Sequence, residues 1–270
     1  MTMDNLEDLL EPVCEIARAA GRQIEGIRMG GADVEHKEDG SPVTVADRAS
    51  HDVIADGLAE LTPDIALISE EGDVEKDVGG APFWLVDPLD GTKEFIKGLG
   101  EYTVNIALVR QGDPVLGVVY APALDKRYWA ARGAGARVQA ATAKPAAIAP
   151  RSSGHRTAAI SRSHASEETQ VLLDKLGVEE VARMGSSLKL CAVADGTADV
   201  YPRLGPTYLW DTAAAAAVVR EAGAQVYSLD GRPVDYSPRG DLKLPGFIVC
   251  AGRQGRVPIE AVLEALSGGA

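Results

Sequence analysis

The stretch FWLVDPLDGTKEF, residues 83–95, joins an apolar run to two aspartates that stand three residues apart. The run at 83–86 is short and bounded by turn residues, which predicts a buried β-strand. Pro88 has a fixed φ and no backbone donor, so we expect the strand ladder to end there. Asp87 and Asp90 would then lie together at the carboxyl end of a buried strand.

The residues that follow provide further polar groups at the same place. Gly91 permits a tight turn, and Thr92 is expected to open a short helix. Hard divalent cations bind oxygen ligands, here two carboxylates and the Leu89 carbonyl, and helix N-termini bind phosphate. Taken alone, the stretch is explained more simply by Asp90 capping a helix and Asp87 capping a turn.

Other acidic residues also stand at the ends of predicted elements. Glu70 and Glu71 follow the strand predicted at 65–68, Asp211 begins an alanine-rich helix, and Asp47 lies near another helix start. Each has an ordinary explanation as a solvated loop residue or a helix cap. If several of them converge, their mutual repulsion requires cations, and two or more Mg²⁺ ions are the economical explanation.

Composition limits the classes of protein. The chain has 270 residues, a formal net charge of -13 and 46% hydrophobic residues. Such acidity argues against nucleic-acid and anionic-membrane partners, which need a basic surface. The three cysteines form no CxxC pair, and no apolar run reaches the roughly 18 residues that span a bilayer. The N-terminus does not resemble a signal peptide, and we expect a cytoplasmic protein.

Strands alternate with helices in both halves, and some strands are antiparallel, which predicts a mixed α/β (α+β) fold with layered helices and sheets. Apolar periodicity predicts helices at 5–29 and up to about residue 61, separated by a polar loop at 36–47. A Gly-Asp-Pro turn joins a predicted hairpin. The Ala/Pro-rich stretch 141–154 is either a surface loop or a boundary between subdomains 1–150 and 151–270.

Four ordered motifs resemble the lithium-sensitive, magnesium-dependent phosphatases of the inositol monophosphatase superfamily. They are KEDGSPVTVAD (37–47), LISEEG (67–72), WLVDPLDGTKEF (84–95) and WDTAAAAAVVREAG (210–223). The resemblance implies a layered α-β-α-β-α sandwich. The Lys-Glu-Phe after Asp-Gly-Thr, together with SRSH and GSSLKLC, is most similar to the 3'(2'),5'-bisphosphate nucleotidases of that superfamily.

The resemblance also implies roles for particular residues. The metal ligands would be Glu70, Asp87, the Leu89 carbonyl, Asp90 and Asp211. Glu70 and Thr92 would position the attacking water, with Asp47 as partner of Thr92 or as ligand of a weaker metal. The scissile phosphate would lie against Leu89, Asp90, Asp211 and the amides of Gly91 and Thr92.

A bisphosphate substrate has a second phosphate that needs cationic or hydrogen-bonding partners inside an acidic protein. By similarity to the nucleotidases, the candidates are His164, Ser186, Lys189 and Arg203. Each also has an ordinary explanation: His164 as a polar residue before a helix, and Lys189 as a solvated lysine at a helix start.

The implied reaction is Mg²⁺-dependent removal of the 3'-phosphate of adenosine 3',5'-bisphosphate to give AMP, with two or three Mg²⁺ per site and inhibition by Li⁺. The sulfated analogue of that nucleotide is a further candidate substrate. Alternatives are a phosphatase of inositol or sugar phosphates, a non-catalytic metal- or anion-binding protein, and a purely structural role for the acidic residues. The partner is a small molecule rather than nucleic acid. Monomer and homodimer stay open, as does peripheral association with the inner face of the membrane.

Overall fold

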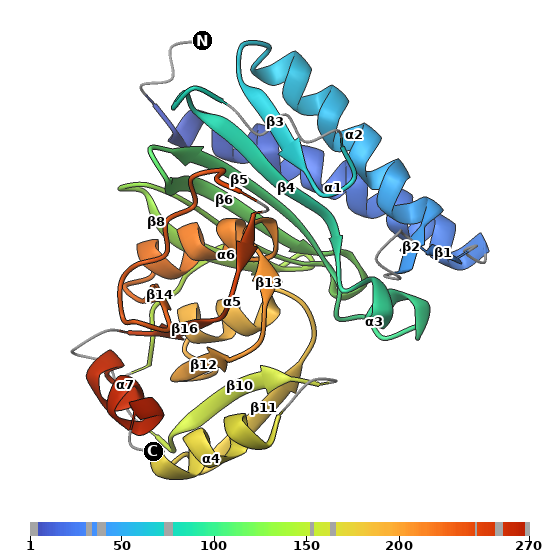
Figure 1. Cartoon of the computed structure of the whole chain (residues 1–270). Coiled ribbons are helices and arrows are strands. Elements are labelled where there is room, and N and C mark those ends of the chain that lie inside the picture. The colour runs from blue at the N-terminus through green and yellow to red at the C-terminus, as the bar shows by residue number, and fades with distance from the viewer. Residues whose placement is uncertain are drawn as a thin grey trace.

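The protein is a stack of two β-sheets and three helical layers, seen in the computed structural model in Figure 1. The structure describes residues 5–30, 34–36, 42–72, 78–151, 154–162, 166–240, 242–251 and 256–267. Two long helices cover one face of the larger sheet, two helices lie between the sheets, and two cover the outer face of the smaller sheet. The α-β-α-β-α sandwich that the resemblance implies is confirmed.

Seven helices and a short 3₁₀ segment fall within the described ranges. They are α1 Glu7–Gly30, α2 Val45–Leu61, α3 Thr92–Ile96, η1 Pro122–Leu124, α4 Glu167–Lys175, α5 Leu188–Ala194, α6 Trp210–Glu221 and α7 Ile259–Ser267. The helices predicted at 5–29 and up to residue 61 are confirmed as α1 and α2. Ser166 caps α4 through its hydroxyl, which accepts a hydrogen bond from the Thr169 amide.

The larger sheet has the order β3-β4-β5-β6-β7-β8-β9, and only the β3–β4 pair is parallel. Its strands are β3 Ala66–Ser69, β4 Phe83–Asp90, β5 Thr103–Arg110, β6 Asp113–Ala121, β7 Lys126–Ala131, β8 Gly135–Ala140 and β9 Ala146–Ala147. The turn between β5 and β6 is Gln111-Gly112, both with positive φ, so the expected Gly-Asp-Pro turn was placed one residue too late.

The smaller sheet has the order β11-β10-β12-β16-β14 and mixed strand directions. Its strands are β10 Thr157–Ser161, β11 Glu180–Met184, β12 Val200–Arg203, β14 Gln225–Ser228 and β16 Phe247–Cys250. Two small pairs, β1 Val34–His36 with β2 Pro42–Thr44 and β13 Thr207–Tyr208 with β15 Lys243–Leu244, were not predicted. β1 ends at the first residue of the segment 36–47, which we expected to be only a polar loop, and β2 lies within that segment.

β4 corrects the prediction about Pro88. The strand continues to Asp90, which pairs with Thr103 of β5, and a register shift between Asp87 and Asp90 accommodates the proline. A bulge of this kind leaves residues without ladder partners and re-aims their side chains. Both aspartates therefore belong to the paired strand, one on each side of the register shift.

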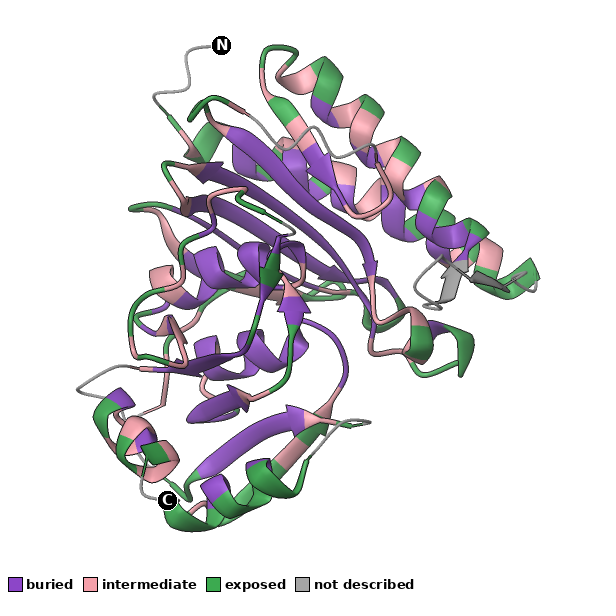
Figure 2. Ribbon diagram, viewed as in Figure 1, coloured by how far each residue is buried: buried purple, intermediate pink, exposed green. Residues whose placement is uncertain are grey.

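The middle helices explain why α6 is rich in alanine. Gly117 of β6 lies so close to α6 that an added Cβ would stand 2.1 Å from the Ala214 carbonyl oxygen. Small residues on both sides allow this approach, and Figure 2 shows α5 buried along its length and α6 buried over most of its length, at Trp210 and from Thr212 to Val219. This core takes residues from both predicted subdomains, 1–150 and 151–270, so that division stays a prediction.

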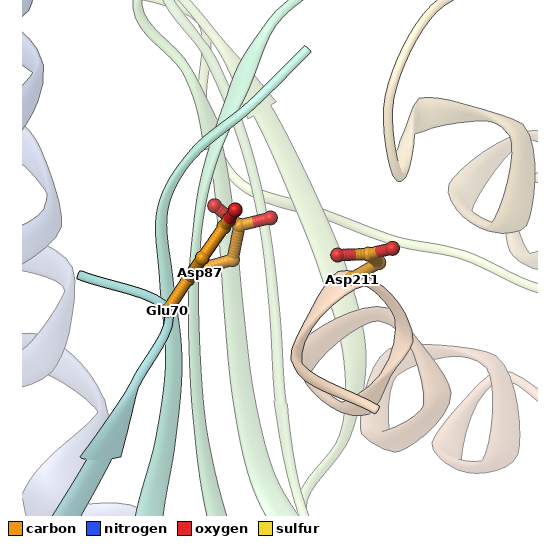
Figure 3. Close-up of side chains that lie close together, drawn as sticks. All are labelled: Glu70, Asp87 and Asp211. Carbon is orange, nitrogen blue, oxygen red and sulfur yellow. The ribbon is translucent and has the colours of Figure 1, made fainter. Parts of the chain in front are cut away.

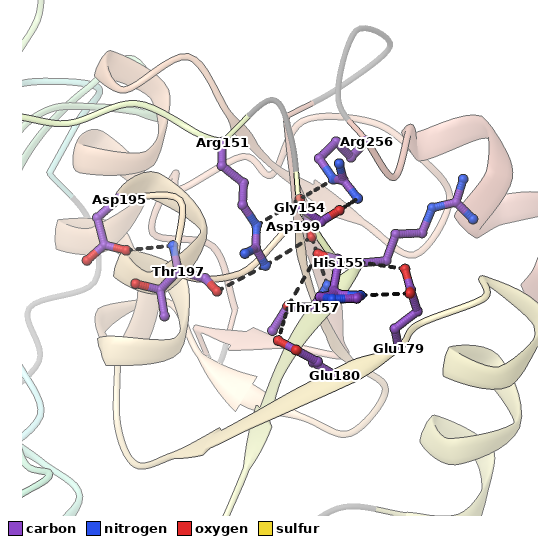
Figure 4. A network of polar contacts seen from close by, with 11 residues as sticks. Arg151, Gly154, His155, Thr157, Glu179, Glu180, Asp195, Thr197, Asp199 and Arg256 are labelled. Carbon is purple, nitrogen blue, oxygen red and sulfur yellow. Dashed lines mark hydrogen bonds and ion pairs between the residues drawn. The ribbon is translucent and has the colours of Figure 1, made fainter.

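A buried carboxylate connects segments at the end of the smaller sheet where β10 and β12 begin (Figure 4). Asp199 accepts a hydrogen bond from the Thr157 amide at 2.8 Å and forms ion pairs with Arg151 and Arg256. These contacts connect the chain before β10 with the segment before α7. Among the described helices, none has the length and apolar character needed to cross a bilayer.

Candidate metal centre and its cavity

Three carboxylates from separate elements converge at the end of the larger sheet. Glu70, Asp87 and Asp211 each offer an oxygen, and these ligand atoms lie within 4.8 Å of one another. Figure 3 shows Glu70 and Asp87 side by side at the sheet and Asp211 facing them from the helix across the gap. The sequence could say only what would follow if these acidic residues met, and the structure shows that three of them do.

Local hydrogen bonds hold each of the three in place. The Glu70 amide donates to the Val86 carbonyl at 3.1 Å, which keeps Glu70 beside β4 just after β3 ends. Asp211 accepts from the Tyr208 amide at 3.0 Å and from the Thr207 hydroxyl. The N-cap of α6 is Leu209, so Asp211 stands in the first turn and does not cap the helix.

Capping explains the position of only one of the two aspartates of β4. Asp87 accepts a hydrogen bond from the Leu89 amide at 3.0 Å, which is the turn contact that the structural explanation expects. The N-cap of α3 is Gly91, at φ 94°, so Asp90 does not cap that helix. Neither Asp90 nor Asp211 is therefore explained as the N-cap of a helix, although Asp211 Oδ2, like Asp87 Oδ1, accepts local hydrogen bonds.

The electrostatics of the cluster call for a cation. Burial, followed by repulsion from Glu70 and Asp90, raises the pKa of Asp87 well above its usual range. Burial also raises the pKa of Asp211, and it raises the pKa of Asp90 to about 7 with a further contribution from Asp211. Buried carboxylates held this close are stabilised by bound cations, and an all-oxygen donor set suits Mg²⁺-like ions.

Asp90 is not one of the three most closely grouped carboxylates, but it faces the same space. The charge of Lys189, the nearby backbone amide of Ser187 and the charge of Arg203 lower its pKa against the effect of burial. It lies between the acidic cluster and a set of basic groups, where a bridging anion would fit.

Thr92 and Asp47 form a second polar unit beside the cluster. The Thr92 hydroxyl lies 3.1 Å from Asp47 Oδ1 and 3.3 Å from the Leu89 carbonyl oxygen. The other oxygen of Asp47 accepts from the amide and hydroxyl of Thr44, both at 2.7 Å, in the capping box that begins α2. The structure thus brings Asp47 and Thr92 together, as predicted.

The cavity next to the cluster also contains three of the four residues predicted to bind a second phosphate. Ser186, Lys189 and Arg203 line it together with Asp90 and Asp211, and its volume is about 150 Å³. His164 lies outside the described residues. The roles of all these residues stay predictions, but their common location is a property of the fold.

The basic side of the cavity is built from buried groups. Lys189 is 5% exposed, so it is not a solvated lysine at a helix start; its Nζ donates to the Ser186 carbonyl at 2.5 Å and lies 5.5 Å from the centre of the Tyr201 ring. Ser186 Oγ and Arg203 Nε are buried without a hydrogen-bond partner among the described residues. Unpartnered buried donors that line a cavity are suited to bind an anion.

Sequence reasoning missed a buried polar cluster under this cavity. Ser187 Oγ lies 2.7 Å from Asn105 Oδ1 and 2.8 Å from Thr103 Oγ1, and all three side chains are buried. Asn105 pairs with Asp87 across the β4–β5 ladder, and Thr103 pairs with Asp90. The signal was two polar residues, two positions apart, in an otherwise apolar strand.

Taken together, the layered fold and the carboxylate cluster define a metal-dependent α/β protein, and comparison with known sequences agrees. A sequence model of the inositol monophosphatase family matches residues 5–254, so the chain belongs to this family, which is metal-dependent. The predicted superfamily is confirmed.

Its relatives include bacterial bisphosphate nucleotidases. The 3'(2'),5'-bisphosphate nucleotidase CysQ of Salmonella typhimurium strain LT2 is 49% identical over 245 residues, which cover 89% of this chain and 99% of the relative. The crystal structure of CysQ from Bacteroides thetaiotaomicron superposes with a TM-score of 0.78 at 37% identity, covering 91% of this chain and 98% of that one. The suhB protein of Bartonella henselae gives a TM-score of 0.80 at 26% identity, covering 96% and 98%.

Proposed function

We propose that this protein is a Mg²⁺-dependent 3'(2'),5'-bisphosphate nucleotidase. It removes the 3'-phosphate of adenosine 3',5'-bisphosphate to give AMP, and it acts on the sulfated analogue of that nucleotide as well. The observation that carries the proposal is a single cavity with carboxylates at one side and buried, partly unpartnered donors at the other. The 49% identity to a nucleotidase of this name supports the same substrate class.

The carboxylate side would hold the metal ions. Its proposed ligands are Glu70, Asp87, the Leu89 carbonyl, Asp90 and Asp211. Bound Mg²⁺ ions lower the pKa of a coordinated water and neutralise charge on the phosphoryl group and the leaving oxygen. The raised pKa of the buried carboxyls fits this assignment, because bound cations offset their burial and repulsion.

The protein's own groups would then orient the nucleophile and the phosphate. Asp47 accepts hydrogen bonds from Thr44 with one oxygen, and its other oxygen is 3.1 Å from the Thr92 hydroxyl. Asp47 can therefore take the Thr92 proton, which leaves a lone pair of Thr92 Oγ1 to accept a proton from the attacking water. Glu70 would align that water, and the amides of Gly91 and Thr92 would bind the scissile phosphate.

The basic side would bind the second phosphate. Lys189 supplies a buried positive charge, Ser186 Oγ an unpartnered hydroxyl, and Arg203 a guanidinium with an unpartnered Nε. A monophosphate bound at the metals would leave these donors unsatisfied, which costs binding free energy. His164 is proposed as a fourth contact.

A substrate panel tests the proposal. With saturating Mg²⁺, kcat/KM for adenosine 3',5'-bisphosphate should exceed that for inositol-1-phosphate by at least about 100-fold, since two buried donors go unpaired when the substrate has a single phosphate. It should also exceed kcat/KM for fructose-1,6-bisphosphate. Preference for an inositol or sugar phosphate would contradict the assignment.

Lys189→Ala sharpens the test. It should raise KM for the bisphosphate by about 10- to 100-fold, because a charge-assisted contact is lost, while KM for a simple monophosphate changes far less. Equal effects on both substrates would refute the role of Lys189.

The remaining parts of the proposal concern conditions and partners. We propose two or three Mg²⁺ ions per site, inhibition by Li⁺, and a cytoplasmic monomer or homodimer whose partner is its small-molecule substrate. The net charge of -13 disfavours attraction to an anionic membrane surface.

A further inference from the structure

Glu101 connects the two sides of the cavity, although it is neither a predicted ligand nor a predicted substrate contact. It lies in the segment before β5, and its Oε2 accepts a hydrogen bond from the Gly185 amide at 2.9 Å. The same carboxylate accepts two hydrogen bonds from the Arg162 guanidinium, one from Nε at 2.9 Å and one from Nη2 at 2.6 Å. Arg162 also donates to the Arg183 carbonyl at 2.9 Å, so Glu101 is joined to the ends of both β10 and β11.

The loop held by Glu101 has an unfavourable backbone conformation. Ser186 has φ 45°, in the left-handed region that non-glycine residues rarely adopt. Gly185 leaves no room for a side chain, since an added Cβ would lie 2.5 Å from the Glu101 carbonyl oxygen. Strain of this kind persists only where surrounding contacts enforce it.

A second set of contacts holds the other end of the loop. The Ser187 hydroxyl is hydrogen-bonded to the side chains of Asn105 and Thr103 of β5. Glu101 therefore holds Gly185, and β5 holds Ser187, so the loop 185–187 is fixed to the larger sheet on both sides of the strained Ser186. Because this loop presents Ser186 and leads into Lys189, its conformation determines where the donors for the second phosphate stand.

We propose that Glu101 is a positioning residue that sets the preference for bisphosphate over monophosphate substrates by holding the loop 185–187 in its strained conformation. This rests on the proposed function, since it assigns the second-phosphate site to Ser186 and Lys189. The pKa of Glu101 is lowered, mainly by the hydrogen bond from Arg162, so the carboxylate is charged at neutral pH.

Two variants of Glu101 separate its contacts. Glu101→Ala removes the acceptor of the Gly185 amide and the partner of Arg162, whereas Glu101→Gln keeps an acceptor for Gly185. The ratio of kcat/KM for adenosine 3',5'-bisphosphate to that for a simple phosphate monoester should fall about 10-fold in the alanine variant, the effect of losing one charge-assisted hydrogen bond. The glutamine variant should retain part of the preference.

Glu179→Ala is the matched control. Glu179 also accepts a backbone amide, that of Arg156 at 3.1 Å, and a side-chain nitrogen, His155 Nδ1 at 2.9 Å (Figure 4). These contacts lie at the opposite end of the β10–β11 pair, away from the cavity. Its substrate ratio should equal that of the unaltered protein.

Hydrogen exchange tests the positioning without reference to any substrate. The amides of Gly185 and Ser187 should exchange at least about 10-fold faster in Glu101→Ala than in Glu179→Ala, because the loop opens more readily. Unchanged exchange, or equal losses of kcat/KM for both substrates, would overturn the inference. A ratio that rises would mean that Glu101 acts by repelling the anion, which also overturns it. If the unaltered protein does not hydrolyse the bisphosphate, the proposed function fails, and the exchange data still decide whether Glu101 holds the loop.

Discussion

Replacing Asp90 by asparagine should make the metal-free protein more stable and abolish its activity. The substitution keeps the size of the side chain and removes a buried negative charge that faces Asp211. Burial raises the pKa of Asp90 from 3.8 to about 7, so between these values the folded chain keeps a proton that the unfolded chain has lost. The contribution of Asp90 to stability is therefore greatest below about pH 4 and falls as the pH rises to about 7.

The size of the effect follows from the pH window. One pH unit in which the folded state holds one extra proton changes the free energy of unfolding by about 1.4 kcal/mol. From pH 5 to a folded-state pKa of about 7 the unaltered protein should lose about 3 kcal/mol through this group. The side-chain amide of the variant does not titrate, so the advantage of Asp90→Asn should grow by the same amount between pH 5 and pH 8.

Urea unfolding in EDTA at pH 5, 6, 7 and 8 measures this difference directly. Asp230→Asn is the control, because Asp230 is exposed and its pKa is lowered by hydrogen bonds from Arg232. Asp230 is ionised in both states across this range, so the control's stability difference should not change with pH. Parallel pH profiles for Asp90→Asn and the unaltered protein would refute the argument that burial and repulsion penalise the Asp90 carboxylate.

Magnesium should offset the stability advantage of Asp90→Asn. At a Mg²⁺ concentration about 100-fold above Kd, the unaltered protein should gain about 3 kcal/mol, because the ion binds only the folded state. Asp90→Asn should gain little and should lose turnover. Near-normal activity of the variant at saturating Mg²⁺ would contradict the assignment of Asp90 as a ligand.

Three further outcomes follow from other parts of the structure. Thr92→Val should lower kcat by about 100-fold or more with little change in stability, because the proton path to Asp47 is broken. Thr92→Ser should keep most of the kcat of the unaltered protein. Equal losses of kcat in both variants would contradict the role of the hydroxyl. Gly117→Ala should lower the free energy of unfolding by at least about 1–3 kcal/mol in urea, since its Cβ would overlap the Ala214 carbonyl; an unchanged midpoint would show that β6 and α6 separate easily. The three buried cysteines should react with a thiol reagent only after unfolding in guanidinium, and rapid reaction of the native protein would show that the core around them opens.

The sequence by itself was sufficient to predict most of the helices and strands, the layered fold through its resemblance to a known superfamily, and most residues of the candidate site. Local signals carry this information: helical periodicity predicted α1 and α2, and polar residues that follow apolar runs pointed to Glu70 and Asp87. Helix starts pointed to Asp47 and Asp211, even though Leu209 rather than Asp211 caps α6. These signals depend on neighbours within a few residues, so they can be read without the fold.

Tertiary structure alone decided which side chains meet, because contacts between distant segments leave no local pattern. It brought Asp211 across to Glu70 and Asp87, and it buried Lys189 at the same cavity. The continuation of β4 past Pro88 depends on a bulge against β5, which the rule for proline in an isolated strand does not include. The hold of Glu101 on Gly185 joins residues that are 84 positions apart, and only the packing of one sheet against the other places them together.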